Sequence, residues 1–430
     1  MAPDQTLEAA VFDPDDVAAG GGLLHRRTLL QGGLVALGAG SAAAAQEAGI
    51  GVGSPASMKT PGAPFSAYGM PSHWRQSIKR SIANPPGRPG TGVSRTPLEF
   101  LEGSITPTGL HFERHHNGVP DIDPDKHELV IHGLVKRPLA FSLDALTRYP
   151  MESHVRFVEC AGNSGGMVAP EPAQQSAGSL HGLVSCSEWT GVPLSVLLDE
   201  AGVDPKARWM LAEGADAAGM SRSVPLWKGM QDAMIALYQN GEPLRAENGF
   251  PMRLLLPGFQ GNINVKWLRR LKLLETPVYT KDETSRYSEL MQGGKARIFM
   301  LQLGVKSVIT RPSLGLSMSG PGVYEISGMA WSGAGRIRKV EVSADGGKSW
   351  AEAQLGELNP SKGVTRFRLP WAWSGQPAVL ISRATDETGA VQPARKAWLA
   401  DYAPGQAYHY HALSSWGVDA SGKVSHVYAS

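Results

Sequence analysis

Residues 156–164 read Arg-Phe-Val-Glu-Cys-Ala-Gly-Asn-Ser, an apolar run that ends in a cysteine followed by small residues. The apolar part is typical of a buried strand, and the glycine behind it of a tight loop. Because the 430-residue chain has only 2 cysteines, Cys160 in such a loop is a candidate metal ligand or nucleophile. Two structural interpretations stay open, namely a disulfide with Cys186 and a small core side chain.

The N-terminal region has the pattern of an export signal. Arg26 and Arg27 precede an apolar run over residues 32–45, whose alanines at 42–45 suit signal cleavage. This run is shorter than a membrane span, which needs about 20 residues. Residues 1–46 are therefore predicted to be a twin-arginine signal peptide, removed when the folded chain reaches the periplasm. The alternative is an uncleaved amphipathic anchor.

The composition is that of a globular protein, with 42% hydrophobic and 19% charged residues. The formal net charge is only +2. Basic and aromatic residues do not recur together in the pattern that is typical of nucleic-acid binding, so we expect no nucleic-acid partner. No further apolar run is long enough for a membrane span in the mature chain. The length exceeds what one hydrophobic core supports and predicts two domains.

The residue patterns divide the chain behind the signal into four parts. A Gly- and Pro-rich arm over 47–95 is followed by a mixed α+β unit over 96–290, a β-rich unit over 296–400 and a tail over 401–430. Within the α+β unit, alternation predicts a strand at 128–133, and the pattern after Pro193 predicts a helix at 194–201. Short β-rich runs separated by Gly and Pro predict a β-sandwich in the next unit. These runs are 323–326, 337–343, 364–369 and 378–384.

Three polar stretches of the α+β unit carry candidate binding residues: 111–120, 240–244 and 247–267. The histidines around Arg114 lack the spacing of a zinc site, so they favour a cationic pocket over a metal centre, with a solvated loop as the alternative. Residues 251–257 are equally typical of a buried strand and turn. Lys266 beside Trp267 has the alternative of a surface lysine lying over an aromatic ring.

Together with Cys160, these stretches resemble the sulfite oxidase family of molybdopterin enzymes, in the same order along the chain. The resemblance covers about residues 96–400 and is closest at 157–163, 240–244, 249–253 and 265–268. Residues 328–333, 340–350 and 383–386 are similar to the family's immunoglobulin-like dimerisation domain. The resemblance implies an α+β fold, in which a molybdopterin domain precedes an immunoglobulin-like β-sandwich, and a homodimer formed through that sandwich.

The resemblance also implies roles for individual residues. Cys160 matches the thiolate that ligates molybdenum, and a soft thiolate suits such a metal. Arg114 matches an arginine that binds oxyanions near the metal, and Tyr287 the tyrosine close to the metal-bound oxygen. The residues implied to contact the molybdopterin are His116, Asp216, Arg253, Lys266 and Asn163. Cys186 is expected to have no role in the metal site.

The chain departs from sulfite-oxidising members at two places. Ser164 stands where they have arginine, and 247–249 read Glu-Asn-Gly where the family often has histidine. Fewer cations at the substrate path favour a larger or less anionic substrate than sulfite, and the small residues at 164–166 are expected to leave room for a protein-borne arm. These departures, with the tail sequences at 415–417 and 425–429, resemble the sulfane dehydrogenases of bacterial thiosulfate oxidation, a branch of the family.

That branch implies oxidation of sulfane sulfur held on a cysteine of a carrier protein, by oxygen-atom transfer. It also implies that electrons pass to a cytochrome c, and this carrier is expected on a separate chain because the sequence has no Cys-x-x-Cys-His motif for a haem of its own. A sulfite dehydrogenase acting on free sulfite is the alternative activity. An alternative of another class is a secreted binding protein whose catalytic domain is dead.

Overall fold

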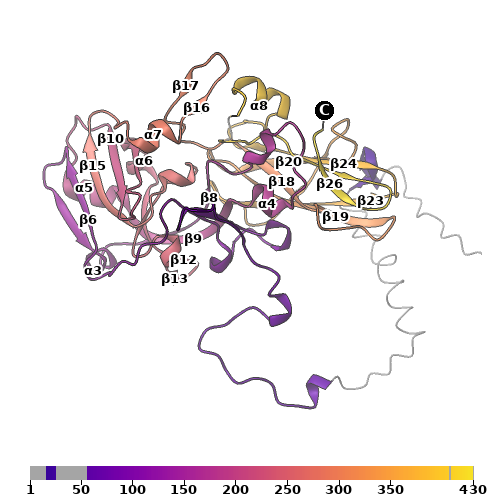
Figure 1. Cartoon of the computed structure of the whole chain (residues 1–430), viewed down its shortest axis with the longest axis horizontal. Helices are drawn as coiled ribbons and strands as arrows, with labels where there is room; N and C mark the ends of the chain where they lie inside the picture. The colour runs from indigo at the N-terminus through magenta and orange to yellow at the C-terminus, as the bar shows by residue number, and fades with distance from the viewer. Residues whose placement is uncertain (1–15, 26–55, 406–407, 430) are drawn as a thin grey trace, which may run out of the picture.

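The computed structural model describes residues 16–25, 56–405 and 408–429 (Figure 1). The mixed unit, with β6, β10 and β15, lies at one end of the molecule, and the β-sandwich with β19, β23 and β24 at the other (Figure 1). The observed architecture is therefore the α+β unit followed by a sandwich that the sequence predicts. Within the described ranges, we find no helix with the length and apolarity to cross a membrane.

The outer sheet of the mixed unit has the order β11-β10-β15-β6-β7. Its strands are β6 (Glu128–Gly133), β7 (Leu139–Ser142), β10 (Trp209–Gly214), β11 (Ser221–Pro225) and β15 (Leu268–Leu274). Helix α5 (Leu194–Ala201) buries its leucines in the same core as this sheet. The strand at 128–133 and the helix at 194–201 are thus confirmed, since their apolar periods match the faces that they bury.

A second sheet carries the candidate cysteine. Its order is β13 (Glu242–Pro243), β12 (Met234–Gln239), β9 (Val184–Pro193) and β8 (Glu152–Glu159), with β14 (Arg253–Leu255) paired to β12. Strand β8 buries Phe157 and Val158 and ends at the residue before Cys160. The predicted strand followed by a loop is therefore confirmed. The alternative for residues 251–257 is confirmed in part, because β14 is a buried strand.

The sandwich consists of two sheets around one core that contains Phe367, Trp371 and Trp416. The first sheet has β18 (Lys306–Arg311), β19 (Gly322–Trp331), β22 (Gln354–Leu355) and β23 (Thr365–Trp373). The second has β20 (Ile337–Ser343), β21 (Ala351–Glu352) and β24 (Ala378–Asp386). Each β-rich run of the sequence thus falls on a strand of the sandwich.

Both chain ends add strands that the sequence analysis does not foresee. Residues expected to form a tail contain β25 (Ser415–Val418) and β26 (Val424–Val427), which extend the second sheet beyond β24. Residues 16–25, inside the predicted signal peptide, contain β1 (Val17–Ala19) and β2 (Leu23–Leu24), and β2 pairs with β23. The rest of the signal prediction lies outside the described residues.

The end of the predicted arm belongs to the mixed unit. Strands β3 (Ser81–Ala83), β4 (Gly92–Arg95) and β5 (Glu113–His115) form one small sheet, in which β4 is central. Residues 57–77 before it are exposed and lack long elements, as the Gly- and Pro-rich composition predicts. Strand β5 brings Arg114 and its neighbouring histidines to the edge of a cavity.

Candidate functional site

A cavity that is partly open to solvent lies between β5, the loop after β8 and the segment before β15. Concave sites lined by a few convergent polar groups are where proteins usually hold a cofactor or a small molecule. Of the residues predicted for the site, those that line the cavity are Arg114, His116, Cys160, Asp216, Arg253, Lys266 and Tyr287. They come from β5, from the loop after β8, from β14 and from four further loops, so the fold gathers them from distant parts of the sequence.

Cys160 contributes the one thiol of this cavity wall. Both cysteines are free, and Cys186 is a core side chain whose Sγ accepts a hydrogen bond from the Val364 amide at 3.4 Å. The disulfide interpretation is therefore wrong. Burial raises the pKa of the Cys160 thiol, while the Gly162 amide and the nearby Arg114 guanidinium act in the opposite direction. A bound metal would hold such a thiol deprotonated.

Tyr287 and His116 form a polar pair on the same wall. The Tyr287 hydroxyl lies 3.1 Å from His116 Nε2. Burial and the surrounding cations, Arg114 first among them, lower the pKa of His116 to about 4, so the imidazole is neutral at pH 7. Burial also raises the pKa of Tyr287, with a further contribution from the nearby Cys160 thiolate, so Tyr287 keeps its proton. The Arg222 guanidinium carbon lies 4.8 Å from the centre of the Tyr287 ring, in a cation–π contact.

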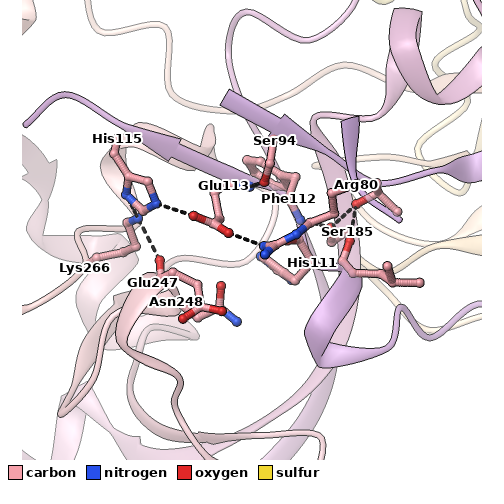
Figure 2. A network of polar contacts seen from close by, with 12 residues as sticks. Arg80, Ser94, His111, Phe112, Glu113, His115, Ser185, Glu247, Asn248 and Lys266 are labelled. Carbon is pink, nitrogen blue, oxygen red and sulfur yellow. Dashed lines mark hydrogen bonds and ion pairs between the residues drawn. The ribbon is translucent and has the colours of Figure 1, made fainter. Parts of the chain in front are cut away.

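Lys266 is oriented by a chain of polar contacts that begins in the arm. Figure 2 shows Arg80 pairing with Glu113, Glu113 with His115, and His115 with Lys266. Lys266 Nζ donates to His115 Nδ1 and to the Glu247 carbonyl, both at 2.9 Å, and His115 Nε2 lies 2.7 Å from the Glu113 carboxylate. This pattern fits a neutral His115 that carries its proton on Nε2. The alternative of a surface lysine is wrong, although Lys266 does lie over the Trp267 ring at 4.3 Å.

Arg253 is a buried cation whose hydrogen-bond partners are backbone carbonyls. Its two Nη atoms donate to the carbonyls of Asn248 and Asn264, at 2.9 and 3.1 Å. Burial lowers the pKa of Arg253 to about 10. Burial, and then the Arg253 charge, lower the pKa of Lys266 strongly. A buried cation and a half-buried one lie next to each other here and repel, so an anion between them would be stabilised.

The cavity wall also holds polar atoms without partners. Arg253 Nε and Asn262 Oδ1 are buried, and neither has a hydrogen-bond partner among the described residues. Buried polar groups in proteins are almost always satisfied, so such atoms indicate that a ligand completes them. A Cβ at Gly261 would lie 2.8 Å from the Glu159 carbonyl oxygen and 3.3 Å from the Cys160 Cα. Only glycine therefore lets this segment pack so closely against the backbone at Cys160. Cations, unpaired polar atoms and a soft thiol together fit an anionic molybdopterin.

The described residues contain no group of His, Cys, Asp and Glu side chains that would hold a metal ion by themselves. The histidines on either side of Arg114, His115 and His116, line the cavity. Asp216 lines the cavity and its Oδ1 accepts from the Met220 amide at 3.1 Å, which fixes the carboxylate at the rim. A metal at Cys160 would need most of its ligands from a cofactor.

Asn163 is the one predicted contact that does not line the cavity. Its Nδ2 donates to Glu159 Oε1 at 2.8 Å, and its Oδ1 accepts from the Leu183 amide at 3.0 Å. The side chain is 1% exposed and is used entirely within the protein. Asn163 therefore positions the loop that carries Cys160, which corrects its predicted role in holding the cofactor.

Ser164 also points away from the cavity, which removes an argument made from the sequence. Its hydroxyl accepts from Lys306 Nζ and lies against His181 Nδ1, each at 2.7 Å, and the residue is 2% exposed. The small side chain at this position therefore makes no room at the substrate path. A cation is present here after all, because Lys306 reaches Ser164 from the sandwich.

Tyr408 is a neighbour of the site that the sequence analysis misses. Its ring centre lies 5.7 Å from that of Tyr287, and a methyl group on Gly162 would lie 3.8 Å from the Tyr408 ring and 3.9 Å from the Cys160 sulfur. The next residue, His409, donates its amide to the Ala161 carbonyl at 2.8 Å. The run Tyr-His-Tyr-His at 408–411 was the available signal, since it concentrates polar rings in a supposed tail.

Comparison with known proteins agrees with this site. Residues 116–281 match the oxidoreductase molybdopterin binding domain, and residues 297–413 the Mo-co oxidoreductase dimerisation domain. The crystal structure of the sulfane dehydrogenase SoxCD from Paracoccus pantotrophus superposes with a TM-score of 0.84 at 42% sequence identity, covering 86% of this chain and 96% of that one. Fold, cavity and both domain matches therefore define a molybdopterin-binding oxidoreductase.

Curated relatives place the chain within that class. Mouse sulfite oxidase (Mus musculus) is 31% identical over 324 residues, which are 69% of this chain and 59% of the relative. An NADH nitrate reductase of Solanum lycopersicum is 32% identical over 351 residues, covering 71% of this chain and 38% of the relative. The chain thus spans well under two thirds of these relatives. It belongs to the sulfite oxidase family of molybdopterin oxidoreductases.

Proposed function

We propose that the chain is the molybdenum subunit of a periplasmic sulfane dehydrogenase. In this proposal it oxidises sulfane sulfur on a carrier protein's cysteine and passes the electrons to a cytochrome c on another chain. The observation that carries the proposal is the 42% identity to the Paracoccus pantotrophus sulfane dehydrogenase over 96% of that chain, against 31% to mouse sulfite oxidase. The dimerisation domain supports a homodimer.

The residues of the cavity divide into those that would hold the cofactor and those that would meet the substrate. Arg253 and Lys266 supply buried positive charge for the pterin phosphate, and Cys160 supplies a thiolate ligand for molybdenum. A bound molybdenum molybdopterin supplies oxygen-atom transfer and two-electron redox chemistry. The chain's own contribution is to bind and orient this group.

Arg114 and the His116–Tyr287 pair lie on the same cavity wall as Cys160. Tyr287 keeps its proton because burial raises its pKa, so its hydroxyl is a hydrogen-bond donor for an oxygen atom of a substrate or product. The Arg114 guanidinium can pair with an anionic sulfur product. Neutral His116 fixes the orientation of the Tyr287 hydroxyl without adding charge.

Periplasmic export is the second part of the proposal. It rests on the arginine pair at 26–27, the short apolar run behind it and the small residues at 42–45. Since this route carries folded proteins, the cofactor would enter before export. N-terminal sequencing of the exported protein tests the cleavage near residue 46, and a start upstream of Arg26 would contradict it.

The experiment that tests the activity compares two substrates on one preparation. Molybdenum-loaded protein is given sulfite, or a carrier protein whose cysteine bears sulfane sulfur, with cytochrome c as electron acceptor. We expect rapid cytochrome reduction with the loaded carrier and little with sulfite, while a Cys160→Ala variant is inactive with both. Fast turnover of sulfite alone would contradict the proposal.

Sulfite dehydrogenase is the second candidate, and one observation favours it. Arg114 lines the cavity beside the thiol, where a guanidinium suits a small oxyanion such as sulfite. The position of Ser164 no longer distinguishes the two activities, because its side chain is turned toward Lys306. The choice of substrate would thus depend on other residues of the cavity wall, such as Arg114 and Tyr287, and on the surface around the cavity.

A further inference from the structure

Residues 16–25 end directly before the arginine pair of the predicted signal peptide, and they are bound to the dimerisation domain. Strands β1 and β2 form a hairpin, closed by a hydrogen bond from the His25 amide to the Asp16 carbonyl at 2.9 Å. Strand β2 then adds to the edge of β23, where Leu23 lies opposite Trp371. The leader segment thus extends a sheet by pairing with a strand that lies more than 300 residues further along the chain.

The contact is apolar at its centre and hydrogen-bonded at its ends. Leu23 and Leu24 are 0% and 1% exposed, and Leu23 belongs to the same core cluster as Trp371. Trp371 Nε1 donates to the Gly21 carbonyl at 2.7 Å, and the Gly20 amide donates to Ser349 Oγ at 2.8 Å. Because apolar surface removed from water stabilises a contact, the two buried leucines hold β2 against the core of the sandwich.

The surface accepts glycine alone at the positions before the leucines. A Cβ at Gly22 would lie 2.0 Å from the Ala372 carbonyl oxygen, and one at Gly21 would lie 2.9 Å from the Ala344 carbonyl oxygen. Gly21 and Gly22 have φ of +73° and +88°, which glycine adopts without strain. The site therefore fits the sequence Gly-Gly-Leu-Leu. An export signal needs only its arginines, its apolar run and its cleavage residues, so this fit has another purpose.

We propose that the edge of β23 is a binding site for residues 16–25 and that it works as a latch on the leader of the precursor. The mode is strand addition to a sheet edge, with side-chain pockets that provide specificity. Because Arg26 follows His25 directly in the sequence, the latch would hold the part of the leader that immediately precedes the arginine pair. An export receptor that binds this pair competes with the domain. Only a precursor with a folded dimerisation domain holds its leader in this way.

This latch rests on the proposed export, and its test separates the two. The full-length precursor is purified from a host without the twin-arginine translocase, and hydrogen exchange of residues 16–25 is measured by mass spectrometry. We expect exchange at least about tenfold slower than in a Gly22→Val variant, whose side chain collides with the Ala372 carbonyl. Val17→Thr, at a half-exposed position of the hairpin, is the matched control and keeps the protection.

Equal exchange in the wild-type and Gly22→Val precursors would overturn the docking. In a host with the translocase, Gly22→Val should shorten the time that the precursor stays in the cytoplasm, and an unchanged time would overturn the latch. Exported protein that still contains residues 16–25 would also overturn it, because β1 and β2 would then be permanent strands. These results do not depend on the sulfur substrate, so failure of the proposed activity would leave them intact.

Discussion

The two faces of the loop that carries Cys160 differ in how completely their polar groups are paired. On the cavity face, Arg253 Nε and Asn262 Oδ1 have no partner among the described residues, and the half-buried Lys266 neighbours the buried Arg253. On the opposite face, Glu159 accepts from Asn163 Nδ2, Lys306 Nζ and Trp331 Nε1 at 2.8 to 2.9 Å. Both faces are buried and rich in charge, so charge alone does not separate them.

The difference teaches which polar residues bind a ligand and which hold the fold. A network in which every member is satisfied stabilises a single arrangement, whereas unpaired groups in a cavity are completed by something that the chain does not supply. The junction behind Cys160, formed by Glu159, Asn163, Ser164, His181 and Lys306, joins the two domains. The cavity in front of Cys160 receives the cofactor. The predictions below change one face at a time.

The largest effect is expected at Cys160, which belongs to the cavity face. Cys160→Ala removes the proposed metal ligand, so turnover should fall well beyond the 10 to 100-fold that is typical for groups behind a metal ligand. Unfolding by urea should be nearly unchanged. Assays of turnover, molybdenum content and stability on one preparation check this. Cys186→Ala is the control, which should keep activity since Cys186 lies in the core; an active Cys160→Ala protein would remove the ligand assignment.

The next effect is on stability and comes from the junction. Lys306→Met leaves the Glu159 carboxylate buried without its cation, which should lower the free energy of unfolding by about 3–5 kcal/mol. Lys339→Met is the control, because Lys339 pairs with Glu341 at the surface and such pairs contribute only about 0–1 kcal/mol. Urea unfolding of both variants measures the difference. Equal losses would mean that the junction does not hold the domains, and Glu159→Gln added to Lys306→Met should restore part of the loss.

Lys266→Gln should have the opposite signature to Lys306→Met. It removes a buried cation that repels Arg253, so the cofactor-free protein should be no less stable than the wild type. Retention of the cofactor should weaken about 10 to 100-fold, measured as molybdenum per chain after desalting. Lys272→Gln, on the exposed face of β15, is the matched control. A Lys266→Gln protein that keeps full molybdenum would show that the phosphate lies elsewhere.

How much of the fold and of the site the sequence predicts depends on how far apart along the chain the contacting residues lie. The strand at 128–133, the helix at 194–201 and the apolar strand before Cys160 follow from local periodicity, and the structure has them. The cavity residues follow from motifs that resemble those of a family. Direction within a loop is not local, because the partners of the Ser164 hydroxyl, His181 and Lys306, follow it by 17 and 142 residues.

Other features were missed for the same reason. Strand β2 is stabilised by β23, and Tyr408 reaches the Cys160 loop from a segment whose composition is that of a tail. Neither segment has a periodic pattern of its own that marks its partner. Domain boundaries were drawn where composition changes, whereas β25 and β26 show that the sandwich continues beyond such a change. These features arise from contacts between segments that lie far apart in the sequence, such as the pairing of β2 with β23.

The smallest effect is a pH dependence from the cavity face. Burial lowers the pKa of His116 from 6.5 to about 4, so the unfolded chain binds a proton between these values and the folded protein does not. The folded protein therefore loses stability through His116 as the pH falls from 6.5 toward 4, and above pH 6.5 this loss is absent. The total loss is about 1 kcal/mol after solvent screening. In cofactor-free protein, His116→Gln should flatten the unfolding free energy over this window by that amount. His154→Gln, an exposed control, should leave the slope as it is, and an equal slope in both variants would mean that His116 is charged in the cavity.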